Sequence, residues 1–198
     1  MNKTKMGLIT LLTALFCLNA QAGVLLEPYL GLGLAGDGKV KSGTTRTDMT
    51  YDVAPTAGFR AGYSMWGATL GLDASYQKLT LESSQLSGTN IIPLGETDVD
   101  KTQAGIFLGY TLPVPMRFWL SYYFMGNAKL ENDNKYTSGS GYAFGTSYTG
   151  FSMFAINLEY RNMKYDEFET AAGVTSTTDA NLAEMLLSVS MPFDLELF

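Results

Sequence analysis

Charged side chains occur at alternate positions of short segments that are otherwise rich in small and apolar residues, and they are the first candidates for chemistry. Glu159 and Glu184 could together do acid–base work. Arg161 follows Glu159 by two residues, so both side chains fall on one face of an extended strand. A neighbouring guanidinium favours the charged carboxylate. We therefore expect a salt-bridge network here rather than an acid–base pair.

Further polar residues are expected to belong to this salt-bridge network. Arg60 and Asp73 flank a tight turn at Ser64–Gly67 and fall opposite each other if the two segments form a hairpin. Arg161 and Glu184 lie in the last two segments at similar heights. Charges buried inside a fold must be paired. The predicted network consists of Arg60, Asp73, Gln77, Lys101, Gln103, Arg117, Asn157, Glu159, Arg161 and Glu184.

Other kinds of chemistry find little support. The chain has no histidine, which argues against hydrolases that need an imidazole near neutral pH. Cys17 is the only cysteine and lies in the expected leader, so no zinc–thiolate site or disulfide is predicted. The glycine-rich stretch Gly31–Gly38 lacks the following helix and the GK[ST] of a phosphate loop. We predict a protein that is not an enzyme and has no catalytic, metal or cofactor site.

The first 22 residues have the features of a cleaved signal peptide. Lys3 and Lys5 precede the apolar stretch Met6–Leu18, and Ala20 and Ala22 fit an A-x-A cleavage site. About 13 apolar residues are too few for a transmembrane helix, which needs about 20. We predict a signal peptide at residues 1–22 and one domain at residues 23–198. Removing the two lysines leaves 11 basic and 19 acidic residues, a net charge of −8, which does not favour nucleic-acid binding.

The elements that must position the charged residues are strands. Apolar residues alternate with Gly, Ala, Ser, Thr and scattered charges along eight segments, and no later stretch is typical of a helix. The predicted strands contain Tyr29–Gly36, Ala54–Tyr63, Thr69–Gln77, Lys101–Leu112, Arg117–Phe124, Gly141–Tyr148, Phe154–Arg161 and Glu184–Phe193.

Long and short connections alternate between these strands. Short turns are predicted at Ser64–Gly67, Pro113–Pro115 and Tyr148–Phe151. Long connections are predicted at Gly36–Thr50, Ser83–Asp100 and Asp166–Asp179, and a connection of medium length is predicted at Glu131–Gly139. An even number of strands with short turns at one end and long loops at the other is typical of outer-membrane barrels. A closed barrel suits lipid because it leaves no sheet edge with unpaired backbone groups.

A soluble eight-stranded barrel or sandwich is the alternative, since apolar and polar residues would alternate along its strands as well. Its solvated face would carry many Lys and Glu, whereas the less apolar face here carries mainly Gly, Ala, Ser and Thr. Such small residues fit inside a narrow barrel. We therefore predict an all-β fold, an eight-stranded antiparallel up-and-down transmembrane β-barrel. We expect its lumen to be filled by the polar network.

The chain resembles the small eight-stranded outer-membrane barrels of the OmpA, OmpX and OmpW type. The resemblance is architectural, and its most specific element is the closing strand with Phe193 and Phe198. It implies recognition of one of these aromatic residues by the bacterial barrel-assembly machinery. It also implies location in the outer membrane of a Gram-negative bacterium, in contact with membrane lipid and lipopolysaccharide.

Two functions are consistent with these features. The first is a structural or surface-interaction role, in which a rigid, filled barrel displays four long extracellular loops. The second is a narrow channel for small hydrophobic molecules, as the resemblance to OmpW implies. A charged, filled lumen favours the first function, and an apolar tunnel through the upper lumen would favour the second. The loops contain no motif that names a ligand.

Overall fold

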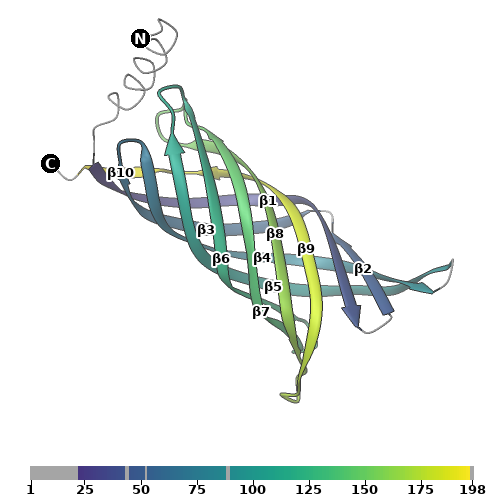
Figure 1. The fold of residues 1–198 in the computed structure, drawn as a ribbon. Coiled ribbons are helices and arrows are strands. Elements are labelled where there is room, and N and C mark those ends of the chain that lie inside the picture. The colour runs from purple at the N-terminus through teal and green to yellow at the C-terminus, as the bar shows by residue number, and fades with distance from the viewer. Residues whose placement is uncertain (1–21, 43–44, 52, 88–89, 197–198) are drawn as a thin grey trace, which may run out of the picture.

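The computed structural model describes residues 22–42, 45–51, 53–87 and 90–196, which form strands and short connections (Figure 1). Residues 1–21 of the predicted signal peptide lie outside the described residues, as does Phe198. Among the described residues, no helix is long and apolar enough to cross a membrane.

Ten strand segments make up the fold. They are β1 (Ala22–Ser42), β2 (Thr45–Tyr51), β3 (Ala54–Met65), β4 (Ala68–Ser87), β5 (Asn90–Thr111), β6 (Met116–Leu130), β7 (Lys135–Tyr148), β8 (Ala155–Glu169), β9 (Thr175–Ser190) and β10 (Phe193–Glu196).

These ten segments form a ring of eight strands, as predicted. The segments β2 and β3 are two parts of one strand, because both pair with β1 on one side and with β4 on the other. The segments β9 and β10 both pair with β1 and are separated by Met191 and Pro192. Pro192 has no backbone N–H to donate to a ladder, which explains the interruption.

The ring is antiparallel throughout and closes between its first and last strands. Each strand pairs with its neighbour in sequence, and β1 also pairs with β9 from Tyr29↔Ser190 to Lys41↔Asp179. The C-terminal segment β10 lies beside the start of β1, at the end of the barrel that carries the short connections (Figure 1). Closure satisfies the backbone of strands that would otherwise be edges. The predicted up-and-down barrel is confirmed.

The two faces of the wall are inverted relative to a soluble protein. Large apolar side chains cover the outside; Leu30 is 70% exposed and Leu70 is 62% exposed. Charged side chains occupy the inside; Asp73 and Arg161 are each 0% exposed. Charged residues are almost never fully buried in soluble proteins unless they are paired. An apolar outer face around a polar interior is the arrangement expected in lipid.

Aromatic residues mark the two rims of the apolar outer face. Tyr63, Trp66 and Phe193 are exposed near the short connections. Tyr122 and Tyr160 are exposed toward the opposite rim. Tyr and Trp are enriched at membrane interfaces because an apolar ring and a polar group can lie at the headgroup level.

The four long connections differ from the prediction, because most of their residues continue the strands. The segments β1 and β2 stay paired up to Ser42↔Thr45, and β4 and β5 stay paired up to Ser87↔Asn90. Only residues 131–134 separate β6 from β7, and only residues 170–174 separate β8 from β9. The polar sequence that predicted loops instead forms hairpins that extend the strands.

The short connections lie at the other end. The turn between β3 and β4 consists of Trp66 and Gly67, whose φ angles are 54° and 79°. Two positive φ angles are typical of the type I′ turn, whose twist matches that of a hairpin. The connection between β7 and β8 spans residues 149–154 and is longer than the predicted turn at Tyr148–Phe151.

Candidate functional site

The lumen contains a charged layer nearer the short connections and an apolar layer nearer the outer hairpins. The charged layer holds all the buried charged residues of the described chain. They are four cations, Arg60, Lys101, Arg117 and Arg161, and four carboxylates, Glu27, Asp73, Glu159 and Glu184. The layer is therefore neutral overall, which limits the cost of burying charge.

Arg60 lies at the centre of the charged layer. It is directly opposite Asp73 in the β3–β4 ladder, and its Nε lies 3.2 Å from Asp73 Oδ2. Its Nη2 lies 2.6 Å from Glu159 Oε2 across the lumen. The guanidinium also lies between two aromatic rings, 4.7 Å from the Tyr29 centroid and 4.3 Å from the Trp119 centroid. Four different strands thus converge on one cation.

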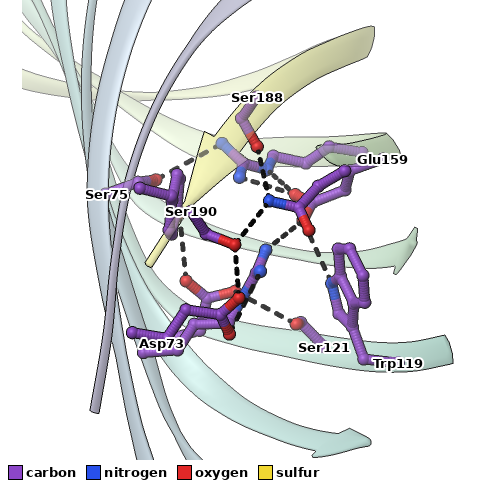
Figure 2. Close-up of polar contacts among 12 residues, drawn as sticks. Asp73, Ser75, Trp119, Ser121, Glu159, Ser188 and Ser190 are labelled. Atoms are coloured by element: carbon purple, nitrogen blue, oxygen red, sulfur yellow. Dashed lines mark hydrogen bonds and ion pairs between the residues drawn. The ribbon is translucent and has the colours of Figure 1, made fainter. Parts of the chain in front are cut away.

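Asp73 accepts hydrogen bonds from four different residues, more than any other carboxylate of the charged layer. It accepts hydrogen bonds from Tyr29 at 3.1 Å, Ser121 at 3.2 Å and Tyr123 at 3.0 Å, in addition to its ion pair with Arg60. Figure 2 shows the Asp73 and Ser121 side chains directed toward each other from β4 and β6, which are separated in the wall by β5. Several donors around one carboxylate stabilise its charged form in a buried site.

Arg161 links two carboxylates on the other side of the lumen. Its Nη2 lies 2.6 Å from Glu159 Oε1, and its Nη1 lies 3.5 Å from Glu184 Oε1. Glu184 also lies 2.5 Å from Lys101 Nζ and accepts a hydrogen bond from the Tyr51 hydroxyl. Each of these carboxylates therefore has at least two strong partners, so neither is available as a general base.

A third group closes the charged layer toward the short connections. Arg117 pairs with Glu27 across the lumen, and Ser190 donates a hydrogen bond to the same carboxylate at 2.6 Å. Asn157 donates to Ser188 at 3.2 Å and to Ser190 at 3.0 Å (Figure 2). These contacts connect β1, β6, β8 and β9.

The structure places all ten residues of the predicted network inside the lumen. Arg60, Asp73, Lys101, Arg117, Glu159, Arg161 and Glu184 form the ion pairs described above. Asn157 contacts serines of β9, and the Gln103 amide lies 3.0 Å from the Ser75 hydroxyl. Gln77 is buried in the same layer.

Sequence reasoning missed several members of this layer. Tyr29 already lies in the predicted strand Tyr29–Gly36 and shares the face of Gly31 and Gly33, and extending that strand by two residues would have added Glu27 to the same face. Tyr51 could not be found in this way, because the prediction placed it next to a loop. The remaining missed partners of the carboxylates are Trp119, Ser121, Tyr123 and Ser190.

The apolar layer lies between the charged layer and the outer hairpins. Its buried residues include Leu79, Leu81, Val99 and Leu182, with Met49 and Tyr136 packed against them. A cavity of about 30 Å³ lies among these side chains and also touches Lys101.

One polar atom in the wall of this cavity lacks a partner. Tyr165 lines the cavity and is 3% exposed, and its hydroxyl has no hydrogen-bond partner among the described residues. A buried polar group without a partner is uncommon in native proteins, where such a group is often satisfied by a water or a ligand. The lining of the cavity is therefore mainly apolar, with Lys101, Tyr136, Tyr165 and Asn181 as its polar residues.

The described part of the chain contains no group of three or more His, Cys, Asp or Glu residues that could hold a metal ion. Of the two residues predicted as an assembly signal, Phe193 begins β10, pairs with Leu26 and is 53% exposed on the outer face. Phe198 lies outside the described residues.

Solved structures with similar folds are small bacterial surface barrels. Neisserial surface protein A has 15% sequence identity and a TM-score of 0.50; the match covers 87% of this chain and 99% of that one. OprG from Pseudomonas aeruginosa has 11% identity and a TM-score of 0.51, with 88% and 97% covered. Ail of Yersinia pestis, solved in complex with the heparin analogue sucrose octasulfate, has 15% identity and a TM-score of 0.50, with 86% and 99% covered.

These identities are low, so the three structures support the fold alone. No curated protein sequence matches the chain. The family model for the outer membrane protein beta-barrel domain matches residues 8–193, which is most of the sequence. With an apolar outer face, a polar lumen and a closed ring of eight strands, the chain belongs to the outer membrane protein beta-barrel family.

Proposed function

We propose that this protein is a closed, non-enzymatic barrel of the outer membrane that holds its four outer hairpins as a rigid surface for structural or binding roles. The observation that carries the proposal is the neutral charged layer, in which the Arg60 guanidinium lies within 4.0 Å of carboxylates from three other strands, Glu27, Asp73 and Glu159. The interior of an eight-stranded barrel is just wide enough for side chains to fill. We expect such a layer to leave no continuous polar path for ions.

The absence of catalysis is part of the proposal. A general base must reach the proton that it abstracts. Glu159 is held by Arg60, Arg161 and the Trp119 indole, all within 3.1 Å, and is buried in the middle of the lumen. The sequence also contains no histidine that could serve instead.

Conductance in planar bilayers tests whether the barrel is closed. We expect no stepwise conductance from the wild-type protein. A neutral double truncation, Arg161→Ala with Glu184→Ala, removes one cation and one carboxylate and serves as the sensitivity control. Stable steps from the wild-type protein, equal to those of the double variant, would show that the charged layer does not seal the lumen.

The apolar cavity favours a second candidate function, the binding or passage of small hydrophobic molecules. Its lining is mainly apolar, with Lys101, Tyr136, Tyr165 and Asn181 as the polar residues. Because a volume of about 30 Å³ holds about one water-sized molecule, a solute would have to widen this cavity to bind or pass. Uptake of a small hydrophobic dye by intact cells that contain or lack the protein tests passage, and a rise in melting temperature on adding short-chain alcohols tests binding. Binding that Tyr165→Phe weakens, without faster dye uptake, would assign a closed pocket rather than a channel.

Export and assembly are proposed from the resemblance to known barrels. The N-terminus of the outer-membrane form should begin at Gly23, as mass spectrometry would show. If the assembly machinery recognises the terminal aromatic residue, deletion of Leu195–Phe198 should lower outer-membrane levels while refolding in detergent remains intact. Equal loss in both assays would indicate that these residues are needed for folding itself.

A further inference from the structure

Two charged atoms in the lumen face each other across a gap. Arg60 Nη1 and Glu27 Oε2 lie 4.0 Å apart, and both side chains are at most 1% exposed. Neither atom has a hydrogen-bond partner among the described residues. Arg60 uses its Nε and Nη2 atoms for the contacts with Asp73 and Glu159, and Glu27 accepts its two hydrogen bonds through Oε1. One buried donor and one buried acceptor are therefore left on the two sides of this gap.

The gap has the size that a single water fills. A separation of 4.0 Å is too long for a direct hydrogen bond, and a polar contact of this length often contains a water. Hydrogen bonds of about 2.9 Å from one water to both atoms would meet at an angle of about 90°. The water would accept from Arg60 and donate to Glu27, so the hydrogen-bonding roles match. Without it, two buried charged groups would each lack a hydrogen bond, which costs more than the same lack in neutral groups.

The cavity in the apolar layer offers a second site of the same kind. Its volume is about 30 Å³, and roughly 10–15 Å³ is enough for one water that has polar partners. Tyr165 lines the cavity, and its buried hydroxyl has no partner in the described part of the chain. Lys101 also lines the cavity; its ammonium group has three N–H donors, and Glu184 Oε1 accepts one of them at 2.5 Å. A water here would accept from Lys101 and bond to the Tyr165 hydroxyl.

We propose that the lumen binds two ordered waters as structural ligands, one between Arg60 and Glu27 and one between Lys101 and Tyr165. The two sites lie at opposite ends of a chain of direct ion pairs, which runs Arg60–Glu159–Arg161–Glu184–Lys101. The two waters therefore occupy separate sites, unlike the continuous water of an open pore. Each water completes the hydrogen bonding of the cation at one end of the chain.

The first water also connects two parts of the charged layer. Arg117 and Ser190 bind Glu27, and Ser190 accepts a hydrogen bond from Asn157. The water links this group to Arg60 and, through Arg60, to the rest of the layer. Such a water is as much a part of the structure as a side chain, and removing it is costly.

Solid-state NMR of the mature protein in lipid bilayers tests both sites, through the transfer of magnetisation from water to N–H groups. We expect transfer to the Arg60 guanidinium and to the Lys101 ammonium. The indole N–H of Trp119 is the control, because it donates directly to Glu159 at 3.1 Å in the same layer and should receive much less. Transfer to Arg60 no stronger than that to Trp119, or a crystal structure in which Arg60 Nη1 donates directly to Glu27, would overturn the first site.

The variant Tyr165→Phe removes one partner of the second water and leaves the first site intact. The transfer to Lys101 should fall in this variant, while the transfer to Arg60 should stay at the wild-type level. A Lys101 signal that the substitution does not change would overturn the second site. Heat-modifiable migration on SDS gels checks that the variant is folded.

Unfolding in urea gives an independent measure of the second site. Removing a hydroxyl without a partner costs nothing, whereas removing one that a water connects to Lys101 loses a hydrogen bond. We expect Tyr165→Phe to raise the equilibrium constant for unfolding by about fivefold. The matched control is Tyr142→Phe, whose ring is 51% exposed on the outer face, and it should change that constant by less than about twofold. An unchanged or lower constant for Tyr165→Phe would show that no water bridges its hydroxyl to Lys101.

Discussion

Replacing Arg60 by alanine should strongly destabilise the barrel. The substitution leaves four buried carboxylates with three buried cations and removes the contacts of Arg60 with Asp73 and Glu159, at 3.2 Å and 2.6 Å. Breaking a buried ion pair from one side costs about 3–5 kcal/mol. Asp73 keeps its hydrogen bonds from Tyr29, Ser121 and Tyr123, which reduces the cost. We therefore expect a loss near the lower limit, about 3 kcal/mol.

The assay is equilibrium unfolding in urea after refolding into lipid vesicles, followed by tryptophan fluorescence. Lys129→Ala is the matched control, because Lys129 pairs with Asp133 at 2.8 Å but its side chain is 59% exposed. An exposed ion pair contributes little, so the control should unfold at nearly the wild-type urea concentration. The double variant Arg60→Ala/Asp73→Asn restores the charge balance and should be more stable than the sum of the two single losses implies, by about 0.5–3 kcal/mol.

Two results would refute this reasoning. If Arg60→Ala and Lys129→Ala unfold at the same urea concentration, Arg60 is not part of a packed, water-free layer. If the losses of Arg60→Ala and Asp73→Asn simply add in the double variant, the contact between the two residues does not stabilise the barrel, and the cost comes from the lost packing of the guanidinium against Tyr29 and Trp119.

Further predictions concern the lipid face, the packing of the lumen and the orientation of the barrel. Leu187 faces outward within the apolar belt, so Leu187→Arg should destabilise the barrel by about 2–4 kcal/mol in vesicle unfolding experiments. A Cβ added at Gly145 would overlap the indole of Trp119, so Gly145→Ala should lose about 1–3 kcal/mol in the same assay. An epitope inserted at Gly173 in the β8–β9 hairpin should bind antibody on intact cells, whereas one at Pro113 should not.

Each of these three predictions has a control or an outcome that would contradict it. Gly109→Ala should be tolerated, because a Cβ there would lie 3.6 Å from its nearest neighbours; equal losses at Gly109 and Gly145 would argue against a tightly packed lumen. A stable Leu187→Arg barrel would place that face of β9 in water. Antibody access at Pro113 with protection at Gly173 would reverse the proposed orientation.

The alternation of residue types was sufficient to predict which side chains of the barrel wall point outward and which point inward. Leu187 and Val189 point outward while Ser188 and Ser190 point inward, because successive side chains of a strand point to opposite faces and lipid admits only apolar groups on one of them. The pairing of Arg60 with Asp73 follows from one tight turn, which fixes the register of a hairpin. These features depend only on residues that are close in sequence.

The alternation of residue types did not predict which residues face inward where a strand of the barrel wall is irregular. The ladder between β1 and β9 shifts register between Gly33 and Ala35, so the inward positions change from odd to even numbers along β1. Gly36 therefore faces the lumen beside Tyr51, although an unbroken alternation from Gly33 would point it outward. The polar composition of the outer segments likewise predicted loops, because their outward residues are polar and only scattered residues, such as Met49 and Val99, pack in the apolar layer.

Contacts across the lumen were decided by the tertiary structure alone. Arg117 and Glu27 are separated by 90 residues, and Tyr51 and Glu184 by 133, and neither pair lies on neighbouring strands. Which side chains meet in the interior depends on the number of strands, their tilt and the stagger with which the ring closes. The sequence determines which residues face inward; the closure of the barrel determines which of them meet, because it sets the height at which each strand presents its side chains.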